Sequence, residues 1–192
     1  MPDVPSPSCG RLEVICGPMF SGKTTELIRR LRSSTGTGEV ASICFKPVSD
    51  TRPGGASIRT HGGDSEPATE IDDPRDWRSA MQGRRGGLPR LVGFDEAHFF
   101  GTALVQPVRE LLAIGARVIV AGVERDHRGR PFDPFPELLC EADEVLKLTA
   151  RCARCGGVAV HSYRLSGGGD RIVVGGAESY EPRCRACFVG GR

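Results

Sequence analysis

The stretch LEVICGPMFSGKTTELIRRLR, residues 12–32, decides the fold. It opens with an apolar run, Leu12–Cys16, that has the length and composition of a buried strand. Apolar residues then recur at helical spacing over Thr24–Arg32, which predicts a helix. The letters from Gly17 to Thr24 fit the pattern G-x-x-x-x-G-K-[ST]. A strand, a glycine-rich loop and a helix in this order predict a phosphate-binding loop.

The chemistry expected of this loop follows from its glycines, its lysine and its threonine. Glycine at 17 and at 22 lets the backbone turn so that successive N–H groups point at phosphate oxygens. We expect Lys23 to reach the β- and γ-phosphates and the Thr24 hydroxyl to bind Mg²⁺. A glycine turn with a solvated lysine is the alternative, which the flanking strand and helix disfavour. The residues expected to bind ATP and Mg²⁺ are Gly17, Pro18, Met19, Phe20, Ser21, Gly22, Lys23, Thr24 and Asp95.

Beyond this stretch, the chain alternates between short apolar runs and helical patterns. Because each apolar run is apolar along its length, the pattern predicts an α/β fold. The expected architecture is a P-loop (RecA-like), mostly parallel sheet with helices on both faces. The polar stretch Val48–Glu70 is too long for a simple connector and predicts a functional or mobile loop. Strands are expected at Val40–Phe45, Arg90–Phe94, Arg117–Gly122 and Val145–Leu148, and helices at Pro74–Gln82, Ala103–Ile114 and Pro134–Glu141.

Two adjacent carboxylates, Asp95 and Glu96, follow the apolar run that ends at Phe94. Ligands gather at the carboxyl ends of strands in open α/β sheets. An aspartate there can hold Mg²⁺ together with Thr24, and the neighbouring glutamate is free to act as a general base. The alternative is an acidic pair that a helix N-terminus favours. Residues 95–98 also spell a helicase motif, Asp-Glu-Ala-His, but 192 residues with a net charge of +2 are too few and too weakly basic for a two-domain nucleic-acid motor.

Four of the eight cysteines form two close pairs near the C-terminus. Cys152 with Cys155 and Cys184 with Cys187 are C-x₂-C pairs separated by 28 residues, a spacing typical of a four-thiolate zinc ribbon with a long insertion. Disulfides and free thiols are the alternatives, which a reducing cytosol disfavours. Since four ligands close the coordination sphere, we expect a structural Zn²⁺ rather than a catalytic one.

Changes in residue composition divide the chain into three parts. Residues 1–10, rich in Pro and Ser, predict a disordered N-terminus, 11–148 a P-loop nucleotide-binding domain, and 149–192 a small zinc-binding subdomain. No apolar run is long enough to cross a membrane, and the first residues lack the pattern of a signal peptide. We therefore expect a cytoplasmic protein with no membrane partner, and the small net charge predicts no nucleic-acid partner.

Together these motifs resemble the cytosolic-type (type II) thymidine kinase family. The resemblance implies transfer of the ATP γ-phosphate to the 5′-hydroxyl of thymidine, which gives dTMP and ADP, and the same transfer to the related deoxyuridine. It also implies a role in nucleotide salvage for DNA synthesis and a homotetramer. The segments that carry it are GPMFSGKTTEL (17–27), KP (46–47) with DTR (50–52), DEA (95–97) with FF (99–100), RGRPF (128–132) and VGGAESY (174–180).

The same resemblance implies roles for residues by position. In similar enzymes the segment between the cysteine pairs is a lasso that closes over the nucleoside and holds the base through main-chain groups, so 149–192 is expected to form a lasso subdomain. Glu96 would accept the hydroxyl proton, Asp50 and Arg52 would lie near the reacting hydroxyl, and Gly175 would meet the sugar. The residues implied for the thymine pocket are Met19, Phe99, Val123, Phe132, Ser162 and Tyr180.

Four positions depart from the family pattern. His98 stands where Gln is usual, which predicts activity that responds to pH near neutrality, unless the imidazole faces outward and has no role. Glu124 replaces a usual Asp and His127 a usual Phe, which leaves the base preference open. Ser162, where Thr is frequent, leaves more room beside the base.

The sequence also leaves open a second function. This alternative is a zinc-ribbon P-loop ATPase switch that acts on a protein or nucleic acid. The glycines before Tyr180 argue against it, because a switch needs no nucleoside lid. His61 and His161 are expected to be ordinary loop or packing residues, since sulfur already fills the zinc site, and Trp77 is expected to be a packing anchor.

Overall fold

The computed structural model describes residues 10–33, 42–51, 55–60, 62–82, 88–165 and 174–190. Its centre is a six-stranded sheet in which every pair of neighbouring strands runs parallel. In spatial order the strands are β5 (Thr69–Ile71), β2 (Ser42–Pro47), β6 (Leu91–Phe94), β7 (Arg117–Gly122), β1 (Arg11–Cys16) and β8 (Glu144–Lys147).

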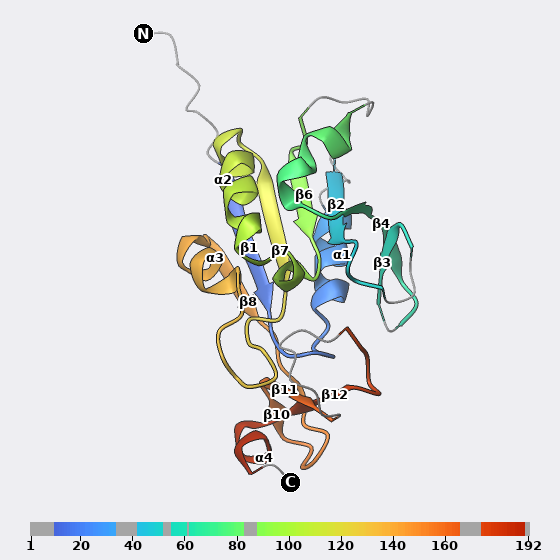
Figure 1. Ribbon diagram of the computed structural model, residues 1–192, viewed down its shortest axis with the longest axis vertical. Coiled ribbons are helices and arrows are strands. Elements are labelled where there is room, and N and C mark those ends of the chain that lie inside the picture. The colour runs from blue at the N-terminus through green and yellow to red at the C-terminus, as the bar shows by residue number, and fades with distance from the viewer. Residues whose placement is uncertain are drawn as a thin grey trace.

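Helices cover both faces of this sheet (Figure 1). Helix α1 (Lys23–Ser33) lies on one face, and α2 (Val105–Ala113) and α3 (Phe135–Glu141) lie on the other. Strand β1 explains how both faces are filled, because its side chains alternate: Leu12 and Val14 join the core beneath α2 and α3, while Ile15 joins the core beneath α1. The expected parallel α/β fold is therefore confirmed.

Three predicted elements differ in detail. Pro74–Gln82 forms two short 3-10 helices, η2 (Pro74–Trp77) and η3 (Ser79–Met81), instead of one α-helix. Trp77 ends the first of them with a fully buried side chain, so its expected packing role is confirmed. The helix predicted to begin at Ala103 starts as a 3-10 turn, η5 (Gly101–Leu104), before α2. Pro107 falls in the first turn of α2, where its missing N–H costs no helical bond.

The polar stretch 48–70 is not a plain loop. It contains β5, which forms the edge of the central sheet, and an antiparallel pair, β3 (Ser57–Arg59) and β4 (Ser65–Pro67). Three-residue strands with exposed polar residues carry almost no periodic signal, which is why the sequence did not predict them. Figure 1 shows this pair beside α1, at the β5 side of the sheet.

The C-terminal part consists of two small antiparallel sheets and a short helix. β9 (Ala150–Arg151) pairs with β10 (Val158–Ala159), and β11 (His161–Arg164) pairs with β12 (Tyr180–Arg183). Helix α4 (Arg185–Val189) follows. These elements lie beneath the carboxyl ends of β1, β7 and β8 in Figure 1, where ligands of parallel sheets gather.

Several predictions fall on residues that the structure does not describe. Arg52 and His61 lie outside the described ranges, as do residues 1–9. Of the segment expected to be disordered, only Gly10 is described, and its N–H donates to the carbonyl of Leu112 at 3.1 Å. Within the described ranges, none of the helices is long and apolar enough to cross a membrane.

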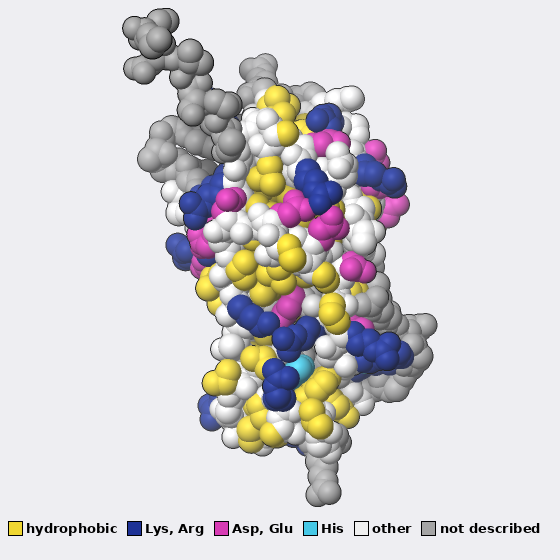
Figure 2. Space-filling view, turned by 90° about the vertical axis from the view of Figure 1, so that its left-hand side faces the viewer, with side chains coloured by type: hydrophobic (Ala, Val, Ile, Leu, Met, Phe, Trp, Pro, Cys, Tyr) yellow, Lys and Arg dark blue, Asp and Glu magenta, His cyan; other side chains and the backbone are white. Residues whose placement is uncertain are grey.

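Surface charges are interspersed rather than segregated on the face that carries α2 and α3. Figure 2 shows basic side chains beside acidic ones over the upper part of this face. Arg109 of α2 donates to Glu137 of α3 at 2.6 Å and also pairs with Glu141, while Arg78 pairs with Glu110. Such exposed pairs contribute little to stability, but they leave this part of the face without a field of one sign.

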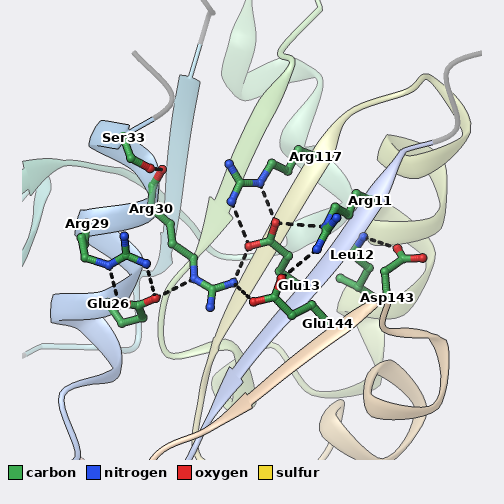
Figure 3. Close-up of polar contacts among 10 residues, drawn as sticks. All are labelled: Arg11, Leu12, Glu13, Glu26, Arg29, Arg30, Ser33, Arg117, Asp143 and Glu144. Atoms are coloured by element: carbon green, nitrogen blue, oxygen red, sulfur yellow. Dashed lines mark hydrogen bonds and ion pairs between the residues drawn. The ribbon is translucent and has the colours of Figure 1, made fainter. Parts of the chain in front are cut away.

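One charged network is buried instead (Figure 3). Glu13 of β1 has only 2% of its side chain exposed, and it accepts hydrogen bonds from Arg117 of β7, at 2.6 Å, and from Arg30 of α1. Arg30 also pairs with Glu26 at 2.8 Å and with Glu144 of β8 at 2.9 Å. The network therefore ties α1 to three neighbouring strands, β7, β1 and β8.

The electrostatic consequence of this network is clearest at Glu13. Burial raises the pKa of its carboxyl, but the hydrogen bonds from Arg117 and Arg30 outweigh burial and hold that pKa below its usual range. Glu13 is therefore ionised at neutral pH and depends on both guanidinium groups.

Candidate active site

The glycine-rich loop lies between β1 and α1. Gly17 and Gly22 have φ of +148° and +86°, conformations that glycine adopts at little cost. A Cβ at Gly17 would lie 2.5 Å from the carbonyl oxygen of Leu148, so the loop passes too close to the end of β8 to carry a side chain there. Lys23 is 7% exposed, and its ammonium donates to the carbonyl of Pro18 at 2.7 Å. The loop backbone and the lysine are thus brought together at the start of α1.

The carboxyl end of β6 brings Asp95 next to this loop. The Thr24 hydroxyl donates to the Asp95 carboxylate, with oxygen–oxygen distances of 3.1 and 3.4 Å. Asp95 is 4% exposed, and its N–H continues the sheet by donating to the carbonyl of Phe45 at 2.9 Å. A hydroxyl and a carboxylate are oxygen ligands of the kind that Mg²⁺ prefers, so this pair fits a magnesium ion.

Glu96, the next residue, points elsewhere. Its φ is +47°, in a left-handed region that residues other than glycine seldom occupy and that is often found at functional sites. It precedes the 3-10 helix η4 (Ala97–Phe99) but makes no side-chain capping bond to it, so the alternative of a helix-terminal acidic pair gains no support. Instead, the turn places Glu96, only 9% exposed, in the wall of a cleft.

That cleft lies where the core meets the C-terminal part. Its empty volume is about 1050 Å³, open solvent included, which suffices for a nucleoside and phosphates. Lys23 and Thr24 line it on one side and Glu96 on another, so the loop and the proposed base face one space. Of the residues expected at the substrate, seven line the cleft: Met19, Phe99, Val123, Phe132, Ser162, Gly175 and Tyr180.

The C-terminal wall of the cleft is attached directly to the glycine-rich loop. The N–H of Met19 donates to the hydroxyl of Ser162 in β11 at 2.9 Å. The glycine-rich segment before Tyr180 forms a turn in which the N–H groups of Ser179 and Tyr180 donate to the carbonyl of Gly176. A Cβ at Gly175 would lie 2.5 Å from the Ser179 hydroxyl, so the close packing of this turn excludes a side chain there.

Not every predicted site residue reaches the cleft. Asp50 follows β2, is 8% exposed and donates its N–H to the carbonyl of Pro47, but it is not among the described residues that line the cleft. Its predicted neighbour Arg52 lies outside the described residues. Two arginines that the sequence did not single out, Arg59 of β3 and Arg125 after β7, do line the cleft. Neither belongs to a recognisable motif, so only the fold could reveal them.

Three of the residues that depart from the family pattern, His98, His127 and Glu124, lie in or near the cleft or are buried. His98 is 7% exposed and lines the cleft, so the alternative of an outward-facing imidazole is wrong. His127 also lines the cleft, and its Nε2 accepts from the guanidinium of Arg128 at 3.4 Å. Glu124 is buried and pairs with the ammonium of Lys147 at 3.0 Å.

His161 is a packing residue, as expected. It is 6% exposed and stacks on Phe188 of α4, with ring centroids 4.2 Å apart. Neither ring nitrogen has a hydrogen-bond partner among the described residues, and burial lowers the pKa of the imidazole. It is therefore held neutral beside the C-terminal helix and takes no part in the cleft.

The four paired cysteines converge on one point. Their sulfur atoms lie within 4.8 Å of one another, and Cys155 and Cys184 are 3.6 Å apart, sulfur to sulfur. Four sulfurs bound tetrahedrally at ~2.3 Å from Zn²⁺ would be about 3.8 Å apart, so the cluster fits such an ion. The backbone N–H of Cys184 is the main cause that lowers the pKa of Cys152 to about 6, which favours a thiolate ligand there. These residues, Cys152, Cys155, Cys184 and Cys187, can hold a metal ion.

Comparisons with known proteins show the family to which the chain belongs. A family model described as "Thymidine kinase" matches residues 10–188. A thymidine kinase of Rhodothermus sp. is 42% identical over 181 residues, which cover 94% of this chain and 82% of that protein. One of Coprothermobacter proteolyticus is 44% identical, covering 91% and 88%, and one of Deinococcus radiodurans is 41% identical, covering 93% and 90%. Because the family model covers residues 10–188 and these relatives are more than 40% identical over most of both chains, the chain belongs to the thymidine kinase family.

Proposed function

We propose that this protein transfers the γ-phosphate of ATP to the 5′-hydroxyl of thymidine, giving dTMP and ADP, and that it phosphorylates deoxyuridine in the same way to give dUMP and ADP. The observation that carries the proposal is the single cleft that Lys23, Glu96 and the turn before Tyr180 share. A loop for phosphates, a carboxylate and a lid of glycine-rich backbone are what phosphoryl transfer to a nucleoside requires.

The proposed base is Glu96. Its carboxylate takes the proton of the 5′-hydroxyl as that oxygen forms its bond to the γ-phosphorus, and the bond from the γ-phosphorus to the bridging oxygen of ADP breaks. Glu96 is 9% exposed and lines the cleft, which supports this role because a carboxylate in the cleft wall can face a bound substrate. By resemblance, Asp50 and Arg52 would lie near the same hydroxyl.

The phosphates are proposed to bind in the glycine-rich loop, residues 17–24. Support comes from the buried hydroxyl of Ser21, which has no hydrogen-bond partner among the described residues and can donate to a phosphate oxygen. Lys23 would exchange its bond with Pro18 for the phosphates, and Mg²⁺, held by Thr24 and Asp95, would neutralise the charge that develops on them.

The thymine base is proposed to bind between the core and the C-terminal part. Phe99, Phe132 and Val123 line the cleft with apolar side chains from the core, and Tyr180 lines it from the C-terminal part. Gly175 and its neighbours offer main-chain groups that can approach the nucleoside because no side chain covers them. We propose that this lasso, rather than a set of polar side chains, reads the base.

The cysteine cluster is proposed to hold a structural Zn²⁺. It would join β9, which ends at Arg151 directly before Cys152, to α4, whose first turn carries Cys187. Four thiolates leave no open coordination position, so the ion stabilises the base of the lasso and supplies no chemistry to the cleft.

We also propose a cytoplasmic homotetramer with no nucleic-acid or membrane partner. The small net charge of +2 supports the absence of a nucleic-acid partner, since binding to a phosphate backbone usually draws on an excess of basic side chains. Light scattering after gel filtration measures the oligomer directly.

The deciding experiment is a panel of nucleosides incubated with Mg²⁺ and ATP labelled at the γ-phosphate. We expect labelled thymidine monophosphate as the main product, a slower reaction with deoxyuridine and none with purine nucleosides. Release of free phosphate without a labelled nucleoside would contradict the proposal and favour an ATPase switch. Addition of DNA or RNA to the same reaction would then show whether a macromolecule stimulates ATP turnover.

A further inference from the structure

His98 lies next to Glu96, the proposed catalytic base, and next to Val123, which lines the cleft. Its Nε2 is 3.6 Å from the Oε2 atom of Glu96, and its Nδ1 is 3.5 Å from the backbone nitrogen of Val123. Both His98 and Glu96 are nearly buried, with 8% and 12% of their side chains exposed. One imidazole thus faces a carboxylate with one nitrogen and a backbone N–H with the other.

The backbone N–H decides the tautomer of this imidazole. An amide N–H can only donate, so Nδ1 of His98 must be the acceptor and carries no proton in the neutral ring. The proton of the neutral ring then sits on Nε2, the atom that faces Glu96. The ring is therefore set to donate to the carboxylate. The distance of 3.6 Å is longer than a hydrogen bond, as is common in sites that tighten when substrate binds.

Packing holds the imidazole in this orientation. Its ring packs against the rings of Phe99 and Phe132, with centroid distances of 4.3 and 5.1 Å. Gly122, at the end of β7, makes room for it, since a Cβ there would lie 3.1 Å from His98 Nδ1. A side chain at Gly122 would crowd the imidazole at the atom that accepts from Val123.

We propose that His98 is a positioning residue that orients Glu96 for catalysis, an inference that rests on the proposed function. By donating from Nε2 to Oε2, it fixes the plane of the carboxylate that accepts the proton of the 5′-hydroxyl of the nucleoside. Its other bond goes to Val123, and its ring contacts Phe132, both of which line the cleft. A thymine ring bound against Val123 and Phe132 would therefore also hold the imidazole of His98 in place. The imidazole in turn orients the carboxylate of Glu96.

The test compares two substitutions of His98, one that keeps its hydrogen bonds and one that removes them. His98→Gln keeps an acceptor for the Val123 N–H and a donor for Glu96, whereas His98→Phe keeps an aromatic ring against Phe99 and Phe132 but offers neither. We expect kcat for thymidine to fall about tenfold to a hundredfold in the Phe variant and to stay within about threefold in the Gln variant. The KM for ATP should not change in either, because the phosphate loop is untouched.

Two further variants separate positioning from a general loss of packing. In a Glu96→Gln background, His98→Phe should cause no further decrease in kcat, because the group that it orients is gone. His161→Phe is the matched control, a buried histidine stacked on a phenylalanine outside the cleft, and it should leave kcat unchanged. An additive loss in the Glu96→Gln background, or equal kcat in the Phe and Gln variants, would overturn the proposal.

A measurement without turnover checks the tautomer on the intact protein. Long-range ¹H–¹⁵N correlation spectra distinguish imidazoles protonated at Nε2 from those protonated at Nδ1, and the signals missing in His98→Gln identify this residue. We expect a neutral ring with its proton on Nε2, and a proton on Nδ1 would overturn the inference. Absence of thymidine phosphorylation in the wild-type protein would refute the proposed function, whereas an active enzyme unaffected by His98→Phe would refute only the role of His98.

Discussion

Substitution of the buried carboxylate Glu13 by glutamine tests the network that ties α1 to the sheet. Removal of one partner from a buried ion pair typically costs about 3–5 kcal/mol, because the other charge remains buried. Arg30 would keep its contacts with Glu26 and Glu144, so we expect the lower end, about 3 kcal/mol for Glu13→Gln. For a chain of this size that corresponds to a melting temperature lowered by about 6–12 °C. Thermal and urea unfolding followed by circular dichroism measure both quantities.

The matched control is Glu144→Gln. Glu144 also pairs with Arg30, at 2.9 Å, but 41% of its side chain is exposed, so its removal should cost only about 0–1 kcal/mol. A variant of Glu13 no less stable than the variant of Glu144 would refute the reasoning, because it would show that burial does not set the strength of this network.

The pH dependence of the same pair of proteins gives an independent check. The pKa of Glu13 is lower in the folded chain than in the unfolded chain, so its contribution is complete above the unfolded pKa and is lost as pH falls towards the folded one. The stability advantage of the wild type over Glu13→Gln should therefore shrink between about pH 5 and pH 3. An advantage that stays constant over this range would contradict the lowered pKa.

Three shorter predictions concern the cleft and the cysteine cluster. Glu96→Gln should lower kcat by about 10²–10⁴ and leave the KM for ATP unchanged, and unimpaired turnover in steady-state assays would remove Glu96 from the role of base. A strong chelator should release about one zinc ion per chain and expose the C-terminal part to protease before the sheet, and purified protein without zinc by metal analysis would contradict a zinc site. Gly175→Ala should raise the KM for thymidine several-fold while that for ATP stays constant, since its Cβ would lie 2.5 Å from the Ser179 hydroxyl. An unchanged KM for thymidine would place this turn outside the nucleoside site.

The features that could be predicted from the sequence are those whose geometry is local. The loop at 17–24 is defined by glycines and a lysine at fixed spacing between a strand and a helix, and each cysteine pair is a tight turn of its own. Asp95 could be placed because the carboxyl ends of parallel strands share one edge of the sheet. In each case a few neighbouring residues determine the structure.

The features that could not be predicted depend on contacts between distant segments. Nothing near His98 in the sequence indicates that its Nδ1 meets the N–H of Val123, 25 residues later. Arg59 lines the cleft because it lies in β3, a three-residue strand that is too short to show a periodic pattern in the sequence. Asp50, which resemblance places at the substrate, does not line the cleft among the described residues, because β2 ends in a turn that buries it.

The bond between the Met19 N–H and the Ser162 hydroxyl bears on how the protein can vary. What the loop requires at position 162 is an oxygen on the first side-chain carbon, and both serine and threonine supply one. An exchange between them therefore adds or removes a methyl group at the wall of the cleft without breaking the hydrogen bond that joins the glycine-rich loop to β11. Under the proposed function, such an exchange changes the room beside the nucleobase, so preference for one nucleoside over another can evolve while this hydrogen bond is kept.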